Sequence, residues 1–127
     1  MELRRVVITG LGAITPIGNT VSEFWDALCK GVNGAGPITR FDSSKFKTRI
    51  ACEVKNYDSL QFFDRKEARK LDLYAQFAII ASDEAIQDSK INKDNTDFNE
   101  VGVDFSSGIA GNNSFYEEIM SHAAGDG

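Results

Sequence analysis

The side chains with the strongest nucleophilic or metal-binding chemistry are two cysteines and one histidine. Cys29 falls near the end of an expected helix, where the helix dipole disfavours a thiolate. Cys52 stands beside Glu53 in an expected strand, and a neighbouring carboxylate also disfavours the anion. His122 has no partner motif, and the chain has no CxxC pair. We therefore predict ordinary buried or half-buried cysteines, a surface histidine, no metal site and no catalytic set.

A second group with chemical potential is a cluster of cations. Arg65, Lys66, Arg69 and Lys70 stand at i, i+1, i+4 and i+5, which places them on one side of the first turns of an expected helix. One interpretation is a solvated face partly paired with neighbouring acidic residues. The other is a docking surface for an acidic protein or a phosphate.

The pair Gly10 and Gly12 follows a short apolar run, as in a dinucleotide-binding turn. Thr15, however, occupies the position of the third glycine of that motif, and no helix is expected to begin there. A glycine pair that ends a strand is the better interpretation. No cofactor is expected.

Composition disfavours membrane-spanning, secreted and nucleic-acid-binding proteins. The 127 residues are 42% hydrophobic and 26% charged, which suffices for one core. The sequence has neither an apolar run long enough to span a membrane nor a signal-peptide cleavage pattern, so a cytoplasmic protein is expected. The net charge of -5 disfavours nucleic-acid binding.

Charge is distributed unevenly along the chain. Residues 43–70 hold eight basic and four acidic residues, whereas residues 83–127 hold two basic and ten acidic residues. Such asymmetry is typical of solvated faces but also of patches that dock a charged partner.

The elements expected to position these side chains alternate between strands and helices. Residues 6–9 predict a buried strand, and Thr20 with Glu23 forms a capping box at the start of a helix over residues 21–30. Gly31 is expected to cap that helix in a left-handed conformation. Residues 31–44 are rich in glycine and predict a loop.

The second half continues the alternation. Asp64 and Glu67 form another capping box, and apolar residues at helical spacing predict one helix over residues 65–89, whose many alanines favour close packing. The remaining expectations are an extended segment at 49–55, a polar connection at 92–99, a strand at 101–106, a turn at 107–111 and a helix at 115–124. This order predicts an α/β layered fold. Two expected strands are few for such a sheet, so we expect part of a larger domain or a core completed by another chain.

Five motifs occur in order along the chain. They are VVITGLG at 6–12, PIGNT at 16–20, FD at 41–42, RKEARKLD at 65–72 and SGI at 107–109. Together they resemble the β-ketoacyl-[acyl-carrier-protein] synthase II family, the elongating condensing enzymes of the thiolase-like superfamily. The resemblance is collinear and covers essentially the whole chain, but only the N-terminal portion of the family's much longer sequence.

The resemblance implies a fold, a reaction and partners. The fold is a thiolase-like layered α-β-α-β-α arrangement, of which residues 1–127 would be an incomplete N-terminal segment, in a homodimer. Family members transfer an acyl chain from an acidic, phosphopantetheine-bearing acyl carrier protein to a cysteine, and then condense it with decarboxylated malonyl-carrier protein. That cysteine and two histidines lie beyond Gly127 in the family pattern. The 127-residue chain is therefore expected to be inactive alone; the alternative is a non-catalytic remnant that binds carrier protein or dimerises.

Two features carry over residue by residue. Lys66, Arg69 and Lys70 match the basic patch that receives the carrier protein. Ile109 matches the residue at the dimer-side wall of the acyl pocket, where side-chain size helps to set the acceptable chain length.

Three residues depart from the family pattern. Asp104 stands where an aliphatic residue is usual, and Ser106 and Ala110 stand where glycine is usual. In the expected buried strand, Asp104 would be a costly unpaired carboxylate.

Overall fold

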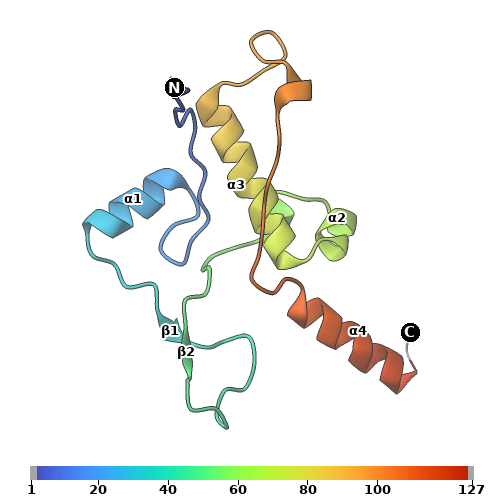
Figure 1. Ribbon diagram of the computed structural model, residues 1–127. Coiled ribbons are helices and arrows are strands. Elements are labelled where there is room, and N and C mark those ends of the chain that lie inside the picture. Colours follow the sequence, from blue (N-terminus) through green and yellow to red (C-terminus); the bar gives the residue numbers. More distant parts are fainter. Residues whose placement is uncertain (1–2, 126–127) are drawn as a thin grey trace.

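The computed structural model describes residues 3–125, and helix α3 runs through the middle of the molecule with α1 and α2 on either side (Figure 1). The long helix is thus the element against which the others are placed. In chain order the elements are α1 (Val21–Cys29), β1 (Gly36–Pro37), β2 (Ile50–Ala51), the 3-10 turn η1 (Ser59–Gln61), α2 (Arg65–Lys70), α3 (Leu73–Ser89), the 3-10 turn η2 (Phe98–Glu100) and α4 (Asn112–Ala124).

Helix α1 begins and ends as its sequence predicts. The Thr20 side chain accepts a hydrogen bond from the Glu23 amide, and the Glu23 carboxylate accepts one from the Asn19 amide at 2.8 Å, one residue before the cap. Gly31 has a φ of 65°. With Val32 it donates to carbonyls of the last turn, and these two bonds satisfy groups that the helix leaves without partners. The predicted Thr20 cap and the left-handed Gly31 are confirmed, whereas the return bond of Glu23 goes to the residue before the cap and not to the cap itself.

The single helix predicted over residues 65–89 is wrong, because the chain breaks it into α2 and α3. Asp72 has extended backbone, and its side chain accepts from the Tyr74 amide at 3.1 Å, so it caps a new helix instead of continuing the old one. Asp64 caps α2 as expected, accepting from the Lys66 and Glu67 amides at 2.7 and 2.8 Å.

The N-terminal segment packs against the backbone of α3. An added Cβ at Gly10 would lie 2.2 Å from the Ala85 carbonyl oxygen, and one at Gly12 would lie 1.8 Å from that of Ala81. Only glycine fits such an approach. The close packing predicted from the alanines of the long helix is confirmed, and the glycine pair has a packing role.

Two carboxylates of α3 then hold this segment through its backbone. Glu84 accepts from the Ala13 amide at 2.8 Å and from the Val21 amide at 2.9 Å, and Asp88 accepts from the Leu11 amide at 2.9 Å. The start of α1 is therefore fixed to the middle of α3 by charge-assisted hydrogen bonds.

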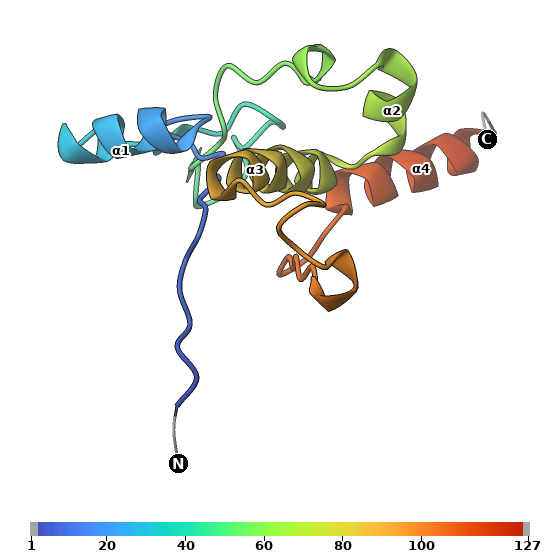
Figure 2. The same ribbon diagram turned by 90° about the horizontal axis from the view of Figure 1, so that it is seen from above.

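The strands predicted at residues 6–9 and 101–106 are wrong. Neither segment joins a sheet within residues 3–125, and Val6 and Val103 are 89% and 86% exposed. Extended apolar backbone becomes a strand only when a neighbouring strand satisfies its amides and carbonyls. Figure 2 shows the start of the chain running away from the helices. Asp104 is accordingly exposed and not in a buried strand.

The sheet in the described part of the chain is a short antiparallel ladder. Gly36 pairs with Ala51 and Pro37 with Ile50. The extended segment predicted at 49–55 is thus confirmed only over two residues, and the predicted loop at 31–44 contains the partner strand.

Three further expectations are resolved by exposure and helix bounds. Cys29 and Cys52 are exposed, so their predicted burial is wrong, because neither the end of α1 nor the two-stranded ladder is covered by another layer. His122 is exposed, as predicted. Helix α4 begins three residues earlier than predicted, directly after Gly111, whose φ is 71°.

Buried side chains are few in the part of the chain that the structure describes. Ile80 is 9% exposed and Gln76 is 6% exposed, both on the same side of α3. Tyr57 packs beside them, edge-on to Phe77 at 5.0 Å and stacked on Phe62 at 6.1 Å. Over residues 3–125, no helix is long and apolar enough to cross a membrane.

Candidate functional site

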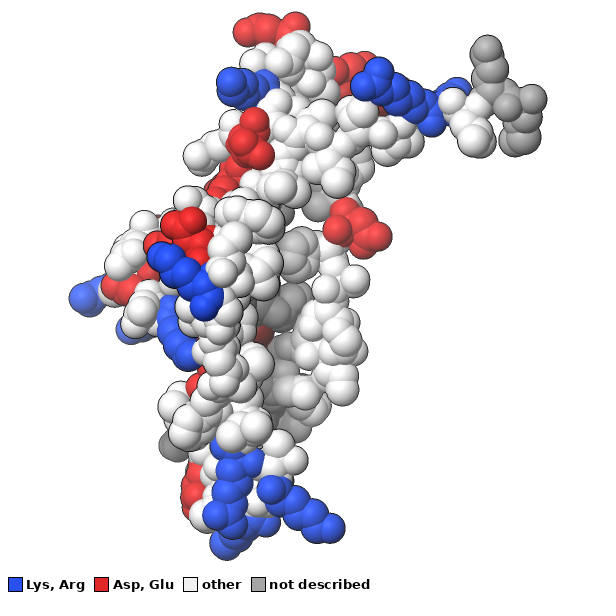
Figure 3. Space-filling model, turned by 90° about the vertical axis from the view of Figure 1, so that its left-hand side faces the viewer, with Lys and Arg blue, Asp and Glu red and all other residues white. Residues whose placement is uncertain are grey.

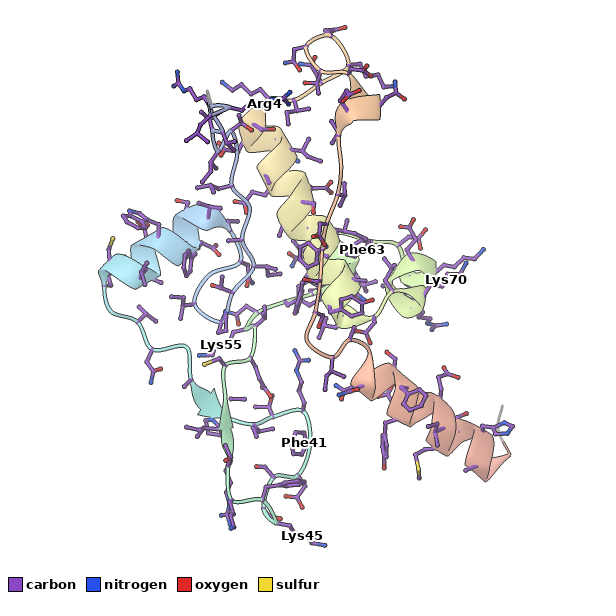
Figure 4. All side chains as sticks on the ribbon, in the orientation of Figure 1. Arg4, Phe41, Lys45, Lys55, Phe63 and Lys70 are labelled. Carbon is purple, nitrogen blue, oxygen red and sulfur yellow. The ribbon has the colours of Figure 1, made fainter. Side chains whose placement is uncertain are left out.

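Helix α2 presents the cationic cluster to solvent. Lys66, Arg69 and Lys70 are all exposed, and Figure 4 shows Lys70 on the side of α2 that faces away from α3. The Asp64 carboxylate at the start of the helix accepts backbone amides. The helix can therefore offer several unburied cations to an anionic partner, attracting it over about one Debye length.

A pocket of about 430 Å³ lies where the end of α2, the start of α3 and the start of α4 meet. Arg69 and Ile109 both line it, so the structure brings one residue of the predicted docking patch and the predicted acyl-pocket residue to the same pocket. Ile109 is 77% exposed. The lining includes two guanidinium groups, of Arg40 and Arg69, and several polar groups from Asp72 and the start of α4. Leu71, Leu73 and Phe77 add apolar surface, so the pocket can contact both a charged and an apolar part of a ligand.

One hydrogen bond joins two edges of this pocket. The Ser114 hydroxyl, in the first turn of α4, donates to a carboxylate oxygen of Asp72 at 2.5 Å. The other oxygen of Asp72 caps α3. The Asp72 carboxylate therefore bonds the first turn of both α3 and α4. The segment before α4, which carries Ile109, is thereby held close to the junction between α2 and α3.

The sequence did not indicate the polar group that lies beside the end of α2. The Gln76 amide nitrogen donates to the Ala68 and Leu71 carbonyls at 3.0 and 2.8 Å, and its oxygen accepts from the Tyr57 hydroxyl at 2.5 Å. Burial, with a smaller contribution from Asp58, raises the pKa of Tyr57. The available signal was a glutamine one turn from both Leu73 and Ile80, outside the apolar stripe that predicted the helix.

A second cationic region lies in the loop between β1 and β2. In Figure 3, Lys and Arg side chains gather at the lower end, where the loop between β1 and β2 lies, and Figure 4 places Lys45 in that loop. Lys45 and Lys47 are exposed. Within the described residues, no group of three His, Cys, Asp or Glu side chains is placed to hold a metal ion.

Residues 3–126 match the family model described as the N-terminal domain of beta-ketoacyl synthase. The chain belongs to this family. It is similar to 3-oxoacyl-[acyl-carrier-protein] synthase 2 of Synechocystis, with 50% identity over 111 residues, and to the protein of that name from Coxiella burnetii, with 49% identity over 111 residues. Each match covers 87% of this chain and 27% of the relative. The chain therefore spans about a quarter of the length of these curated relatives.

A solved structure of the family gives a similar result. The ishigamide ketosynthase/chain length factor is 36% identical, with a TM-score of 0.63 over 72% of this chain and 23% of the other. A further ketosynthase structure, at 22% identity and a TM-score of 0.52, shows the likeness of fold alone. The predicted α/β, thiolase-like fold class is confirmed for the N-terminal part that the chain covers.

Proposed function

We propose that this chain is the N-terminal portion of a 3-oxoacyl-[acyl-carrier-protein] synthase, which elongates fatty acids by decarboxylative Claisen condensation of acyl groups with malonyl-carrier protein. The 50% identity over 111 residues to a synthase of that name carries the proposal. On this proposal, residues 1–127 are the N-terminal segment of a thiolase-like condensing domain in a cytoplasmic homodimer. The nucleophilic cysteine and the two histidines lie in a further segment, so the 127-residue chain does not condense substrates alone.

The role proposed for α2 is to dock the acyl carrier protein. Lys66, Arg69 and Lys70 form an exposed cationic face, and an acidic partner would be steered to it and oriented by complementary charge. The short helix suits this role because residues 66, 69 and 70 lie on one side of it, so their charges are presented together.

The role proposed for Ile109 is to form a wall of the acyl pocket. Its support is the pocket of about 430 Å³ that Ile109 shares with Arg69. A carrier protein bound at α2 would deliver its acyl chain beside an apolar side chain whose bulk limits how far the chain extends. A larger residue at this position would then favour shorter acyl chains.

Carrier binding tests the docking role directly. The variant Lys66→Glu/Arg69→Glu should bind an acidic acyl carrier protein roughly 10- to 100-fold more weakly, because two attractive rim charges become repulsive. The variant Lys45→Glu/Lys47→Glu changes the net charge equally but at the β1–β2 loop, and it should bind nearly as well as the unmodified chain. Equal losses in the two variants, or no loss in the first, would refute the assignment. Calorimetry at two salt concentrations provides the measurement, with weaker binding expected at high salt.

A second candidate is a non-catalytic remnant that keeps only carrier or dimer contacts. The apolar side chains of Val6, Ile8 and Val103 are exposed, which favours a chain that buries them against another protein surface. The intact mass of the cellular polypeptide, with the coding frame after Gly127, separates the two candidates. A continuation with a cysteine and two histidines supports the synthase, whereas a stop codon supports the remnant.

A further inference from the structure

Gln76 is a buried polar side chain in a structure where little is buried. It lies in the first turns of α3 and is 6% exposed. Its amide nitrogen donates to the carbonyls of Ala68 and Leu71, and its oxygen accepts from Tyr57. An amide nitrogen has two hydrogens to donate, so both are used on the chain segment at the end of α2.

The two acceptors are carbonyls that helix α2 cannot satisfy itself. In a continuous helix the Ala68 carbonyl would accept from the amide four residues later, but the chain leaves the helical conformation at Leu71 and Asp72. The Gln76 side chain replaces the missing donors. It therefore caps the end of α2 from the neighbouring helix.

Apolar burial does little to hold α2 in place. The helix has six residues, Arg65–Lys70, of which Ala68 is half-buried and the others are exposed. A helix of this length is not stable by itself in water. Its orientation therefore depends on tertiary contacts at its ends, and the bonds from Gln76 provide such a contact at its C-terminal end.

We infer that Gln76 is the positioning residue for the cationic face of α2. Its two bonds go to residues 68 and 71, and Arg69 and Lys70 lie between these points. The backbone of both cations is thus fixed relative to α3. The inference rests on the proposed docking function and identifies what holds the docking surface in a binding orientation.

Tyr57 determines which way the carboxamide points. Its hydroxyl donates to the Gln76 oxygen, so the amide nitrogen must face the carbonyls of α2. The Tyr57 ring is itself fixed by edge-on contact with Phe77 at 5.0 Å and an interplanar angle of 82°. The segment before η1 therefore contributes to the placement of α2.

Hydrogen exchange and carrier affinity together test the inference. Gln76→Met keeps the length of the side chain and removes its donors. In the 127-residue chain it should raise amide exchange in residues 68–71 by roughly fivefold or more, with little change in α1, because two half-buried carbonyls lose their partners. It should also weaken binding of an acidic acyl carrier protein by roughly 3- to 10-fold and make the affinity less dependent on salt, because the cations are no longer presented together.

Ile80→Val is the matched control, since Ile80 is buried one turn further along α3. It should change exchange without selectivity for α2 and leave carrier affinity nearly unchanged. If the control weakens carrier binding as much as Gln76→Met does, the effect is general destabilisation and the inference is wrong. Unchanged exchange at residues 68–71 in Gln76→Met also overturns it.

Two further variants separate a failure to fold, and a failure of the docking function, from a failure of the inference. If Gln76→Met does not fold, Tyr57→Phe takes its place, and it should raise exchange at residues 68–71 by roughly twofold because the carboxamide loses its orienting donor; no rise overturns the inference. The docking function is tested separately by Lys66→Glu/Arg69→Glu. If that variant binds carrier normally, the docking function fails, and the claim that Gln76 positions a docking face fails with it; exchange at residues 68–71 then reports only whether Gln76 caps α2.

Discussion

Replacing Gly12 with alanine should separate the N-terminal segment from α3. The new Cβ would lie 1.8 Å from the Ala81 carbonyl oxygen and 2.8 Å from the Ala85 amide nitrogen. Since carbon and oxygen approach to about 3.3 Å at the closest, the segment must retreat by about 1.5 Å. That movement breaks the 2.8 Å bond from the Ala13 amide to Glu84. Overpacking costs about 1–3 kcal/mol and a bond to a charged acceptor contributes about 1.5–3 kcal/mol, so a loss on the order of 3 kcal/mol is expected.

Urea unfolding followed by circular dichroism measures this loss. With a denaturant slope of about 1–3 kcal/mol per molar urea, the midpoint should fall by roughly 1 to 3 M. Gly36→Ala is the control, because a Cβ there meets nothing within 4 Å. It should be neutral or slightly stabilising, by about 0.4–1 kcal/mol at most, through the entropy of the unfolded chain. A Gly12→Ala midpoint equal to that of the unmodified chain would refute the packing argument.

Two smaller effects are also expected. Thr20→Ala removes the cap of α1 and should lower the free energy of unfolding by about 1 kcal/mol, whereas Ser22→Ala, an exposed change in the same turn, should not; equal values would contradict the capping role. Because the pKa of Tyr57 is raised in the fold, its neutral form stabilises the chain below about pH 10, and this contribution is lost as pH rises through the raised pKa. The free energy of unfolding should therefore fall less steeply with rising pH in Tyr57→Phe, and identical curves for the two proteins would contradict this expectation.

Helix ends could be predicted from the sequence because their determinants are local. The side chains of Thr20 and Asp64 act within three residues of themselves, and Gly31 needs only its own freedom at positive φ. The break at Asp72 is equally local, yet an uninterrupted apolar period concealed it. Asp72 can continue a helix or cap a new one, and its bond to Ser114, 42 residues away, favours the second.

The strand predictions were wrong because a strand depends on a partner that is distant in the sequence. Residues 6–9 have strong strand propensity, but propensity does not provide the neighbour that a strand requires. The candidate site likewise has one feature that local sequence predicts and one that depends on tertiary packing. The cations of α2 follow from helical spacing, whereas the shared pocket of Arg69 and Ile109 depends on how three helices meet. Gln76 was missed because it lies outside the apolar stripe that predicted the helix, and the sequence does not reveal its acceptors.

The contact between the N-terminal segment and α3 also imposes an order on synthesis. The bonds from Leu11 to Asp88 and from Ala13 to Glu84 join residues 77 and 71 positions apart. At about 5–20 residues per second, the ribosome completes the receiving helix roughly 4 to 15 s after the segment has been made. During that interval residues 10–13 have no helix to pack against, and the apolar run at 6–8 remains exposed in the finished structure as well. The nascent chain therefore depends on charged neighbours such as Arg4 and Arg5, or on a chaperone, to keep this run from associating with other chains.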